Sequence, residues 1–167
     1  MNPDYRQSIT LLLALVLCFS TNAIEPQLNF TPQNGFGGLS FGDGTLKLLF
    51  KKPVTFHVES NGYKQSDGTL RLDQTITFQD QEPQKRHWII KTISPNKYTG
   101  TLSDANGRVK GHTNGSRLTL KYRIKGPLVM HQTLELLPDG KTIDNVGKIT
   151  LFGIPIGTLH ETIIKKD

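Results

Sequence analysis

Four polar side chains fall on the apolar faces of segments in which apolar and polar residues otherwise alternate. Gln74 shares the parity of the apolar residues on either side of it, and the same holds for Arg86, Gln132 and Glu161. In an extended strand, residues of one parity face the same side. A buried polar group needs a hydrogen-bond partner, and a buried charge needs one more strongly. These four side chains are therefore the first candidates for binding chemistry.

An apolar interior with a few polar anchors is typical of a small-molecule pocket. Arg86 would bind a carboxylate or phosphate, and Trp88 would offer a flat apolar contact. We expect the occupant to be a small apolar or amphipathic ligand such as a lipid. The alternative is structural: Arg86 and Glu161 pair or close one end of the fold, and the Gln side chains bond the backbone. The candidate ligand-binding residues are Gln74, Arg86, Trp88, Tyr122, Gln132 and Glu161.

No motif in the sequence argues for catalysis or for a bound metal. The Gly-x-Ser-x-Gly elbow, the His-Glu-x-x-His motif and the phosphate-binding loop are all absent. Asp73, Asp80 and Glu82 are close in sequence, but Asp73 has outward parity and the other two lie in a predicted turn. We therefore expect a protein that is not an enzyme and that has no metal site and no cofactor. The five histidines lack the short spacing of metal-ligand pairs; they are His57, His87, His112, His131 and His160.

The segments that carry the candidate residues have the period of strands. From residue 45 onward apolar and polar residues alternate, and turn signals such as Asn61-Gly62 and Asn114-Gly115 interrupt them. Turns that recur about every eight to fifteen residues predict an all-β fold, either a closed antiparallel barrel of about eight to ten strands or a sandwich. The expected strands cover 45–50, 53–60, 68–79, 86–93, 97–103, 107–112, 116–125, 128–137, 142–152 and 156–164.

The N-terminus has the three-part form of a secretory signal. Arg6 precedes an almost purely apolar run over 9–19, and small residues at 21 and 23 suit a cut after Ala23. We expect residues 1–23 to be removed and the protein to be exported. The alternatives are an uncleaved membrane anchor and lipidation at Cys18, the single cysteine.

Residues 24–44 are rich in Gly, Asn, Pro and Gln. This composition predicts an irregular lead-in before a barrel domain over 45–165.

The formal net charge of +6 favours contact with anionic surfaces such as lipid head groups. Arg117, Lys121 and Arg123 have outward parity on one expected strand and could meet an anionic membrane peripherally. Lys and Arg otherwise lie scattered, so a nucleic-acid partner is not expected. A structural or interaction protein of the cell envelope, with a packed barrel and a basic outer face, is therefore the second functional hypothesis, and we expect a monomer.

Ordered residues along the chain resemble a bacterial envelope family, the domain-of-unknown-function family numbered 3833. The resemblance covers about residues 40–165. It implies an antiparallel, lipocalin-like up-and-down β-barrel, a bacterial source and a periplasmic address. The residues that carry it are Gly68-Thr69-Leu70-Arg71-Leu72-Asp73, Phe78-Gln79-Asp80, Arg86-His87-Trp88-Ile89-Ile90, Tyr98-Thr99-Gly100, Asp104, Gly107, Gly111, Gly115, Tyr122, Asn145, Phe152-Gly153 and Gly157.

Overall fold

The chain forms a ten-stranded antiparallel barrel preceded by one short helix. The structure, a computed structural model, describes residues 28–166, and the expected signal peptide over 1–23, with Cys18, lies outside them. Helix α1 covers Pro32–Phe36. The strands are β1 (Gly38–Leu48), β2 (Val54–Lys64), β3 (Leu70–Phe78), β4 (Gln84–Ser94), β5 (Lys97–Leu102), β6 (Asn106–Asn114), β7 (Arg117–Arg123), β8 (Leu128–Leu136), β9 (Thr142–Leu151) and β10 (Ile154–Lys165).

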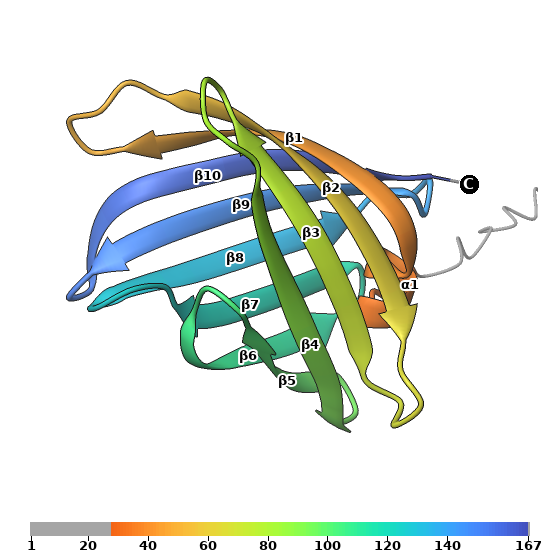
Figure 1. Ribbon diagram of the computed structural model, residues 1–167. Coiled ribbons are helices and arrows are strands. Elements are labelled where there is room, and N and C mark those ends of the chain that lie inside the picture. Colours follow the sequence, from red (N-terminus) through yellow and green to blue (C-terminus); the bar gives the residue numbers. More distant parts are fainter. Residues whose placement is uncertain (1–27, 167) are drawn as a thin grey trace, which may run out of the picture.

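Each strand pairs antiparallel with its neighbours along the chain, and β1 pairs with β10 to close the barrel (Figure 1). Closure leaves no unpaired sheet edge. The prediction of a closed all-β barrel is confirmed, and the sandwich alternative is excluded. Within residues 28–166, no helix is long and apolar enough to cross a bilayer.

Period-two alternation places one face of every strand on a shared interior. Leu70, Trp88, Leu120 and Leu134 come from four different strands and belong to one buried cluster. Their outward neighbours are mostly polar, as expected when only one face of a sheet is dry. The barrel is therefore held by packing, and the candidate polar residues must be accommodated within it.

Helix α1 covers one end of the barrel interior (Figure 1). Phe30 and Phe36 lie in the buried cluster with their ring centroids 5.7 Å apart. The helix begins with a capping box, in which Thr31 and Asn34 each bond the backbone of the other. The backbone N–H of Phe30 donates to the Gly115 carbonyl, 2.8 Å away. These contacts hold two aromatic rings in the barrel end as a plug.

The opposite end of the barrel carries five hairpin loops, over 49–53, 79–83, 103–105, 124–127 and 152–153. We call this end the mouth.

The expected irregular lead-in over 24–44 is wrong for its last seven residues, because β1 begins at Gly38. Two inward positions of β1 are glycines, Gly42 and Gly44. Without apolar side chains there, the sequence lacks the apolar–polar alternation typical of a strand. A Cβ atom at Gly44 would lie 2.4 Å from Cζ of Phe56, so the side chains of the adjacent strands fill the space that these glycines leave. The first strand is therefore not predicted from the hydrophobic pattern, because neighbouring side chains pack against its glycines.

Candidate functional site

Three neighbouring strands present a row of polar side chains to the barrel interior. The pairing register places Ser60 opposite Gln74 and Gln74 opposite Arg86. Oε1 of Gln74 accepts hydrogen bonds from Nε of Arg86, at 2.8 Å, and from Nε1 of Trp88, at 2.7 Å. Its Nε2 atom donates to Oγ of Ser60 over 2.9 Å. Gln74 therefore fixes the orientation of both Arg86 and Trp88.

A second polar chain crosses β7 to β10. The hydroxyl of Tyr122 donates to Oε1 of Gln132 at 3.0 Å, and Nε2 of Gln132 donates to Oδ1 of Asn145 at 3.2 Å. Nδ2 of Asn145 then donates to Oε2 of Glu161 at 2.7 Å. The chain therefore links a buried phenol to a half-buried carboxyl through two amides.

The two polar chains meet at Trp88 and Tyr122, whose rings lie edge to face with their centroids 5.2 Å apart. On the other side of the barrel, β1 contributes Gly42, and a Cβ atom there would lie 2.3 Å from Oε1 of Glu161. The absence of a side chain at this position leaves room for the Glu161 carboxyl. Polar groups thus form a belt around much of the interior, framed by apolar residues on both sides.

Arg86 and Glu161 share this interior without forming an ion pair among the described residues. The guanidinium of Arg86 lies over the Trp88 ring, 5.7 Å from its centroid. Its Nε atom is bonded to Gln74, and its two terminal nitrogens have no acceptor within residues 28–166. Oε1 of Glu161 likewise has no donor in this part of the chain. The structural alternative, in which the two charges pair directly, is therefore not what the structure shows.

Burial controls the protonation of this belt. Loss of hydration raises the pKa of Glu161, and the hydrogen bond from Asn145 and the positive charge of Arg86 oppose this effect only in part. Burial likewise raises the pKa of Tyr122 to about 12. Glu161 therefore holds its proton more tightly than an exposed glutamate, and a protonated carboxyl can donate a hydrogen bond as well as accept one.

A cavity of about 30 Å³ lies at the centre of the belt. A volume of this size holds about one or two water molecules, whereas ligand pockets for drug-sized molecules occupy about 300–1,000 Å³. Phe36 of the plug forms part of the wall. The other lining residues are Leu72, Gln74, Arg86, Trp88, Ile90, Leu120, Gln132, Leu134, Asn145, Glu161 and Ile163.

The six residues predicted from the sequence all face the interior. Five of them line the cavity, and Tyr122 lies behind Gln132, to which it donates its hydroxyl proton. The prediction missed Ser60 and Asn145, although Asn145 shares the parity of the buried Ile143 and could have been found from it. The bonds of Gln74 and Gln132 go to side chains rather than to the backbone.

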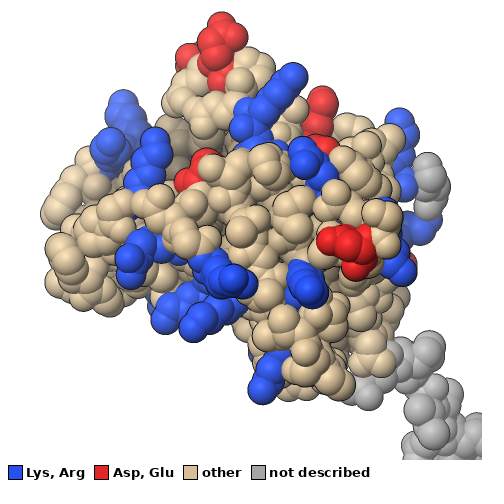
Figure 2. Space-filling view, turned by 60° about the horizontal axis from the view of Figure 1, so that its bottom comes forward, with Lys and Arg blue, Asp and Glu red and all other residues tan. Residues whose placement is uncertain are grey.

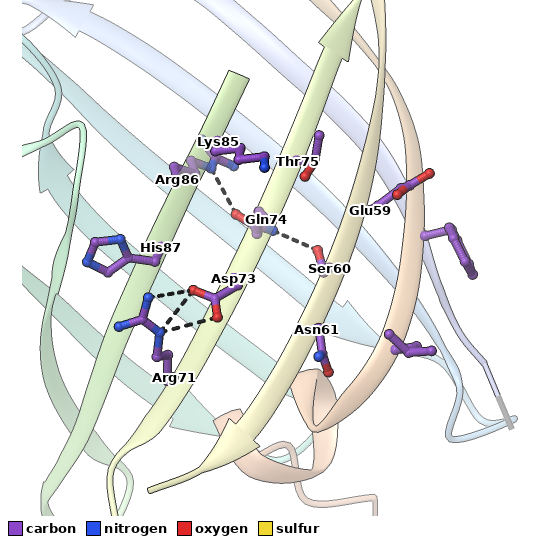
Figure 3. Close-up of a pocket in the computed structure, with 12 residues that line it drawn as sticks. Glu59, Ser60, Asn61, Arg71, Asp73, Gln74, Thr75, Lys85, Arg86 and His87 are labelled. Carbon is purple, nitrogen blue, oxygen red and sulfur yellow. Dashed lines mark hydrogen bonds and ion pairs between the residues drawn. The ribbon is translucent and has the colours of Figure 1, made fainter. Parts of the chain in front are cut away.

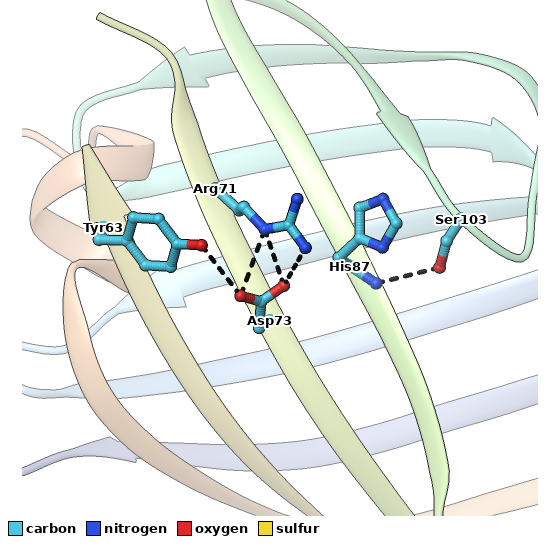
Figure 4. Close-up of polar contacts among 5 residues, drawn as sticks. All are labelled: Tyr63, Arg71, Asp73, His87 and Ser103. Carbon is cyan, nitrogen blue, oxygen red and sulfur yellow. Dashed lines mark hydrogen bonds and ion pairs between the residues drawn. The ribbon is translucent and has the colours of Figure 1, made fainter. Parts of the chain in front are cut away.

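A larger hollow of about 680 Å³ lies on the outer face of β1 to β4 (Figure 3). Its walls are mostly outward side chains, although Ser60, Gln74 and Arg86 also line it. Arg71 pairs with Asp73 at 2.9 Å, and the Tyr63 hydroxyl donates to the same carboxylate at 3.2 Å (Figure 4). The bond from Arg71 holds the pKa of Asp73 below its ordinary value. Because this hollow lies open on the outer face and its Arg71 and Asp73 charges are already paired, the interior belt is the better candidate site.

His57, His87 and His131 point outward as predicted, and within the described residues no three His, Cys, Asp or Glu side chains gather closely enough to hold a metal ion.

The sequence matches one protein-family model over residues 20–165, described as a protein of unknown function, DUF3833. No protein with a curated description matches it.

Two solved structures share the fold. An S-type phycobiliprotein lyase, CPES, from Guillardia theta aligns with a TM-score of 0.62 at 7% identity, over 78% of this chain and 88% of that one. A protein of unknown function from the DUF3598 family of Nostoc punctiforme aligns with a TM-score of 0.57 at 9% identity, over 88% of this chain. The chain spans about half (53%) of that second protein. At these identities the likeness concerns the fold alone.

Proposed function

The chain belongs to the DUF3833 family, and we propose that its barrel binds a small amphipathic molecule, such as a lipid, whose polar end reaches Arg86 and Glu161. The observation that carries the proposal is that two ionisable side chains face one interior cavity with bonding capacity left over. A buried charge without a partner is unfavourable. A ligand that bonds both groups would relieve this, which supports a binding role over a purely structural one.

Arg86 suits an anionic head group such as a carboxylate. A guanidinium bonds a carboxylate through two parallel N–H groups, and Gln74 and Trp88 leave the two terminal nitrogens of Arg86 available while they hold its Nε side. Glu161 would repel an anion if it were ionised. Its raised pKa extends the pH range in which the carboxyl is protonated, and in that form it can donate to the ligand instead.

The cavity must enlarge before it can hold an acyl chain. The element best placed to move is the plug, since Phe36 lines the cavity and α1 is only five residues long. Withdrawal of the plug would open the apolar half of the interior without breaking any strand pairing. The small cavity and the seated plug are therefore what we expect of a binding protein whose interior is closed.

Trp88 is the only tryptophan in the chain, so its fluorescence reports on the interior directly. Titration of the full chain with dodecanoate should change Trp88 emission at lower concentration than titration with uncharged dodecanol. Arg86→Gln should remove this preference, weakening dodecanoate binding by about tenfold, which corresponds to one charge-assisted contact of about 1.4 kcal/mol. Lys85→Gln, the outward neighbour on the same strand, should leave it unchanged.

The proposal fails if neither amphiphile changes Trp88 emission and native mass spectrometry of protein purified from its source finds no bound molecule. That result would favour the second candidate, an interaction protein with a packed interior. The small size of the cavity supports this second reading.

We also propose the cell envelope as the address of the protein, on the strength of the apolar run over 9–19 and the small residues that end at Ala23. Intact-mass measurement of protein recovered from the periplasmic fraction tests it. A mass without residues 1–23 supports export with cleavage, and a chain found only in the cytoplasm contradicts it.

A further inference from the structure

Two neighbouring hairpins at the mouth expose aromatic side chains to solvent. Phe50, in the β1–β2 loop, is 98% exposed, and Phe152, in the β9–β10 loop, is 82% exposed. Leu49 and Ile154 flank them and are also exposed. The backbone N–H of Leu49 donates to the Ile156 carbonyl at 2.8 Å, so the β1–β2 loop lies beside the first residues of β10, which directly follow the β9–β10 loop. The mouth therefore carries exposed apolar side chains on two neighbouring hairpins, whose loops lie at the left of Figure 1.

The backbone at these positions makes the choice of phenylalanine notable. Phe50 and Phe152 have positive φ angles of 61° and 49°. Asn and Asp adopt this conformation most readily among non-glycine residues, and Asp80 and Asn96 occupy it, at 59° and 61°, in two other hairpins of this barrel. Local stability thus favours Asn or Asp at both sites, and phenylalanine contributes nothing to the core from either. An external partner for the two rings explains their presence.

In the segments around these two hairpins, every charged residue is basic. Segments 45–53, 119–133 and 146–159, which form the β1–β2, β7–β8 and β9–β10 sides of the mouth, contain no Asp or Glu. They contain Lys47, Lys51, Lys52, Lys121, Arg123, Lys125 and Lys148.

The strand register also brings basic side chains together behind the mouth. Lys110 lies opposite Lys121, Lys121 opposite His131, and His131 opposite Lys148. Like charges directly opposite each other on neighbouring strands are unfavourable. A groove of about 390 Å³ runs over this row, and Lys110, Lys121 and His131 line it. The row is thus better suited to meet a polyanionic surface than the stripe along β7, where Arg117 already pairs with Glu135 at 2.8 Å.

Acidic residues occupy the other sector of the mouth. Asp80 and Glu82 lie in the β3–β4 loop and Asp104 in the β5–β6 loop. In the left half of Figure 2, which holds the mouth, the lower part shows only Lys and Arg, whereas the upper part shows Asp and Glu together with further Lys and Arg. An anionic surface would attract one side of the mouth and repel the other, which sets the orientation of the barrel.

We propose that the mouth docks on an anionic lipid bilayer, with Phe50 and Phe152 inserted at the boundary of head groups and acyl chains. Lys51 and Lys52 then lie at the level of the phosphates, and the cross-strand row lies two to four residues, or about 7–13 Å, behind the strand ends. Burial of exposed apolar side chains combined with attraction to anionic lipid is the usual basis of interfacial binding. A protein partner fits less well, because the exposed apolar surface is small and the charged residues of the two hairpin segments that carry it, 45–53 and 146–159, are all basic. The proposal does not require a ligand in the interior.

Vesicle co-sedimentation of the full chain tests the proposal. We expect stronger binding to phosphatidylcholine vesicles that contain phosphatidylglycerol than to phosphatidylcholine alone, and weaker binding as salt rises. The double substitution Phe50→Asn and Phe152→Asn should weaken binding at least about tenfold, since each ring contributes on the order of 1.5 kcal/mol or more when buried. Asn suits the positive φ angle, so these variants should keep the fold, which Trp88 fluorescence can verify.

Matched controls separate this surface from the rest of the barrel. Lys51→Glu with Lys52→Glu should weaken binding at least about tenfold, on the basis of about 1 kcal/mol for each basic residue near the lipid. Ile93→Ser and Lys97→Glu, which change an exposed apolar residue and a lysine near the opposite end, should alter binding less than twofold. Equal binding to neutral and anionic vesicles overturns the proposal, as does unchanged binding of both mouth variants. Failure of dodecanoate to bind the interior would leave these results unaffected.

Discussion

Gly42 on β1 faces the carboxyl of Glu161 on β10 so closely that a Cβ atom at position 42 would lie 2.3 Å from Oε1 of Glu161. Glu161 is half-buried, and its other oxygen is bonded to Asn145. The side chain therefore has little freedom to withdraw. The Glu161 carboxyl fills the volume that a side chain at position 42 would need, so the two positions constrain each other's side chains.

Gly42→Ala should lower the free energy of unfolding by about 1–3 kcal/mol, the usual effect of an added methyl group in a packed interior. In a Glu161→Ala background the same substitution should have a much smaller effect, because the clashing carboxyl is gone. Urea unfolding followed by Trp88 fluorescence measures both, and the double-mutant cycle gives the coupling energy. An equal loss in the two backgrounds would show that the glycine is needed for another reason.

Gln74 is the hub of the β2–β4 polar row, and its replacement should be more damaging than that of its partners. Gln74→Leu removes the acceptor shared by Arg86 and Trp88 and leaves two donors unsatisfied. We expect a loss of about 3 kcal/mol or more in the free energy of unfolding. Ser60→Ala removes only one acceptor of Gln74 and should cost about 1 kcal/mol. The same denaturation assay ranks the two, and a reversed ranking would contradict the role given to Gln74.

Glu161 should make stability depend on pH in a direction opposite to that of most carboxylates. Burial raises its pKa in the folded protein above the value in the unfolded chain, so the folded state binds this proton more tightly. The resulting stabilisation is complete below the unfolded pKa, near 4.5, and is lost as pH rises through the folded pKa. The free energy of unfolding of the native chain should therefore fall, relative to that of Glu161→Gln, over this window.

Denaturation of both proteins across acid to neutral pH checks this expectation. Glu59→Gln is the control, since Glu59 is an exposed side chain on the outer face of β2. If the free energies of unfolding of the native chain and of Glu161→Gln differ by the same amount at every pH, the Glu161 carboxyl keeps an ordinary pKa.

Much of this architecture follows from alternation alone, because a closed barrel imposes period two on nearly every residue. The parity of Gln74, Arg86, Gln132 and Glu161 was enough to place all four inside. Alternation fails where the inward residue is glycine, which is why the first half of β1, with Gly42 and Gly44, was taken for an irregular segment.

The partners of the inward residues depend on register, which a single sequence does not reveal. Nothing in the sequence shows that Gln74 lies opposite Arg86 or that Asn145 reaches Glu161. The cavity volume is even harder to predict from the sequence, since it depends on how all the inward side chains and the plug pack together. The solvent exposure of Phe50 and Phe152 was likewise not predicted, because an aromatic residue beside a strand is ordinarily assigned to the core.

Phe36→Ala distinguishes a movable plug from a fixed part of the core. The substitution shortens a buried ring that lines the cavity and packs against Phe30, so it should lower the free energy of unfolding by about 3 kcal/mol. It should also enlarge the cavity and, if the plug gates the interior, accelerate the change in Trp88 emission when dodecanoate is added. Phe78→Ala is the matched control, because Phe78 packs with Phe56 in the second cluster, away from the cavity. That variant should lose stability without faster ligand entry. Equal acceleration in both variants would show that general loosening, rather than the plug, admits the ligand.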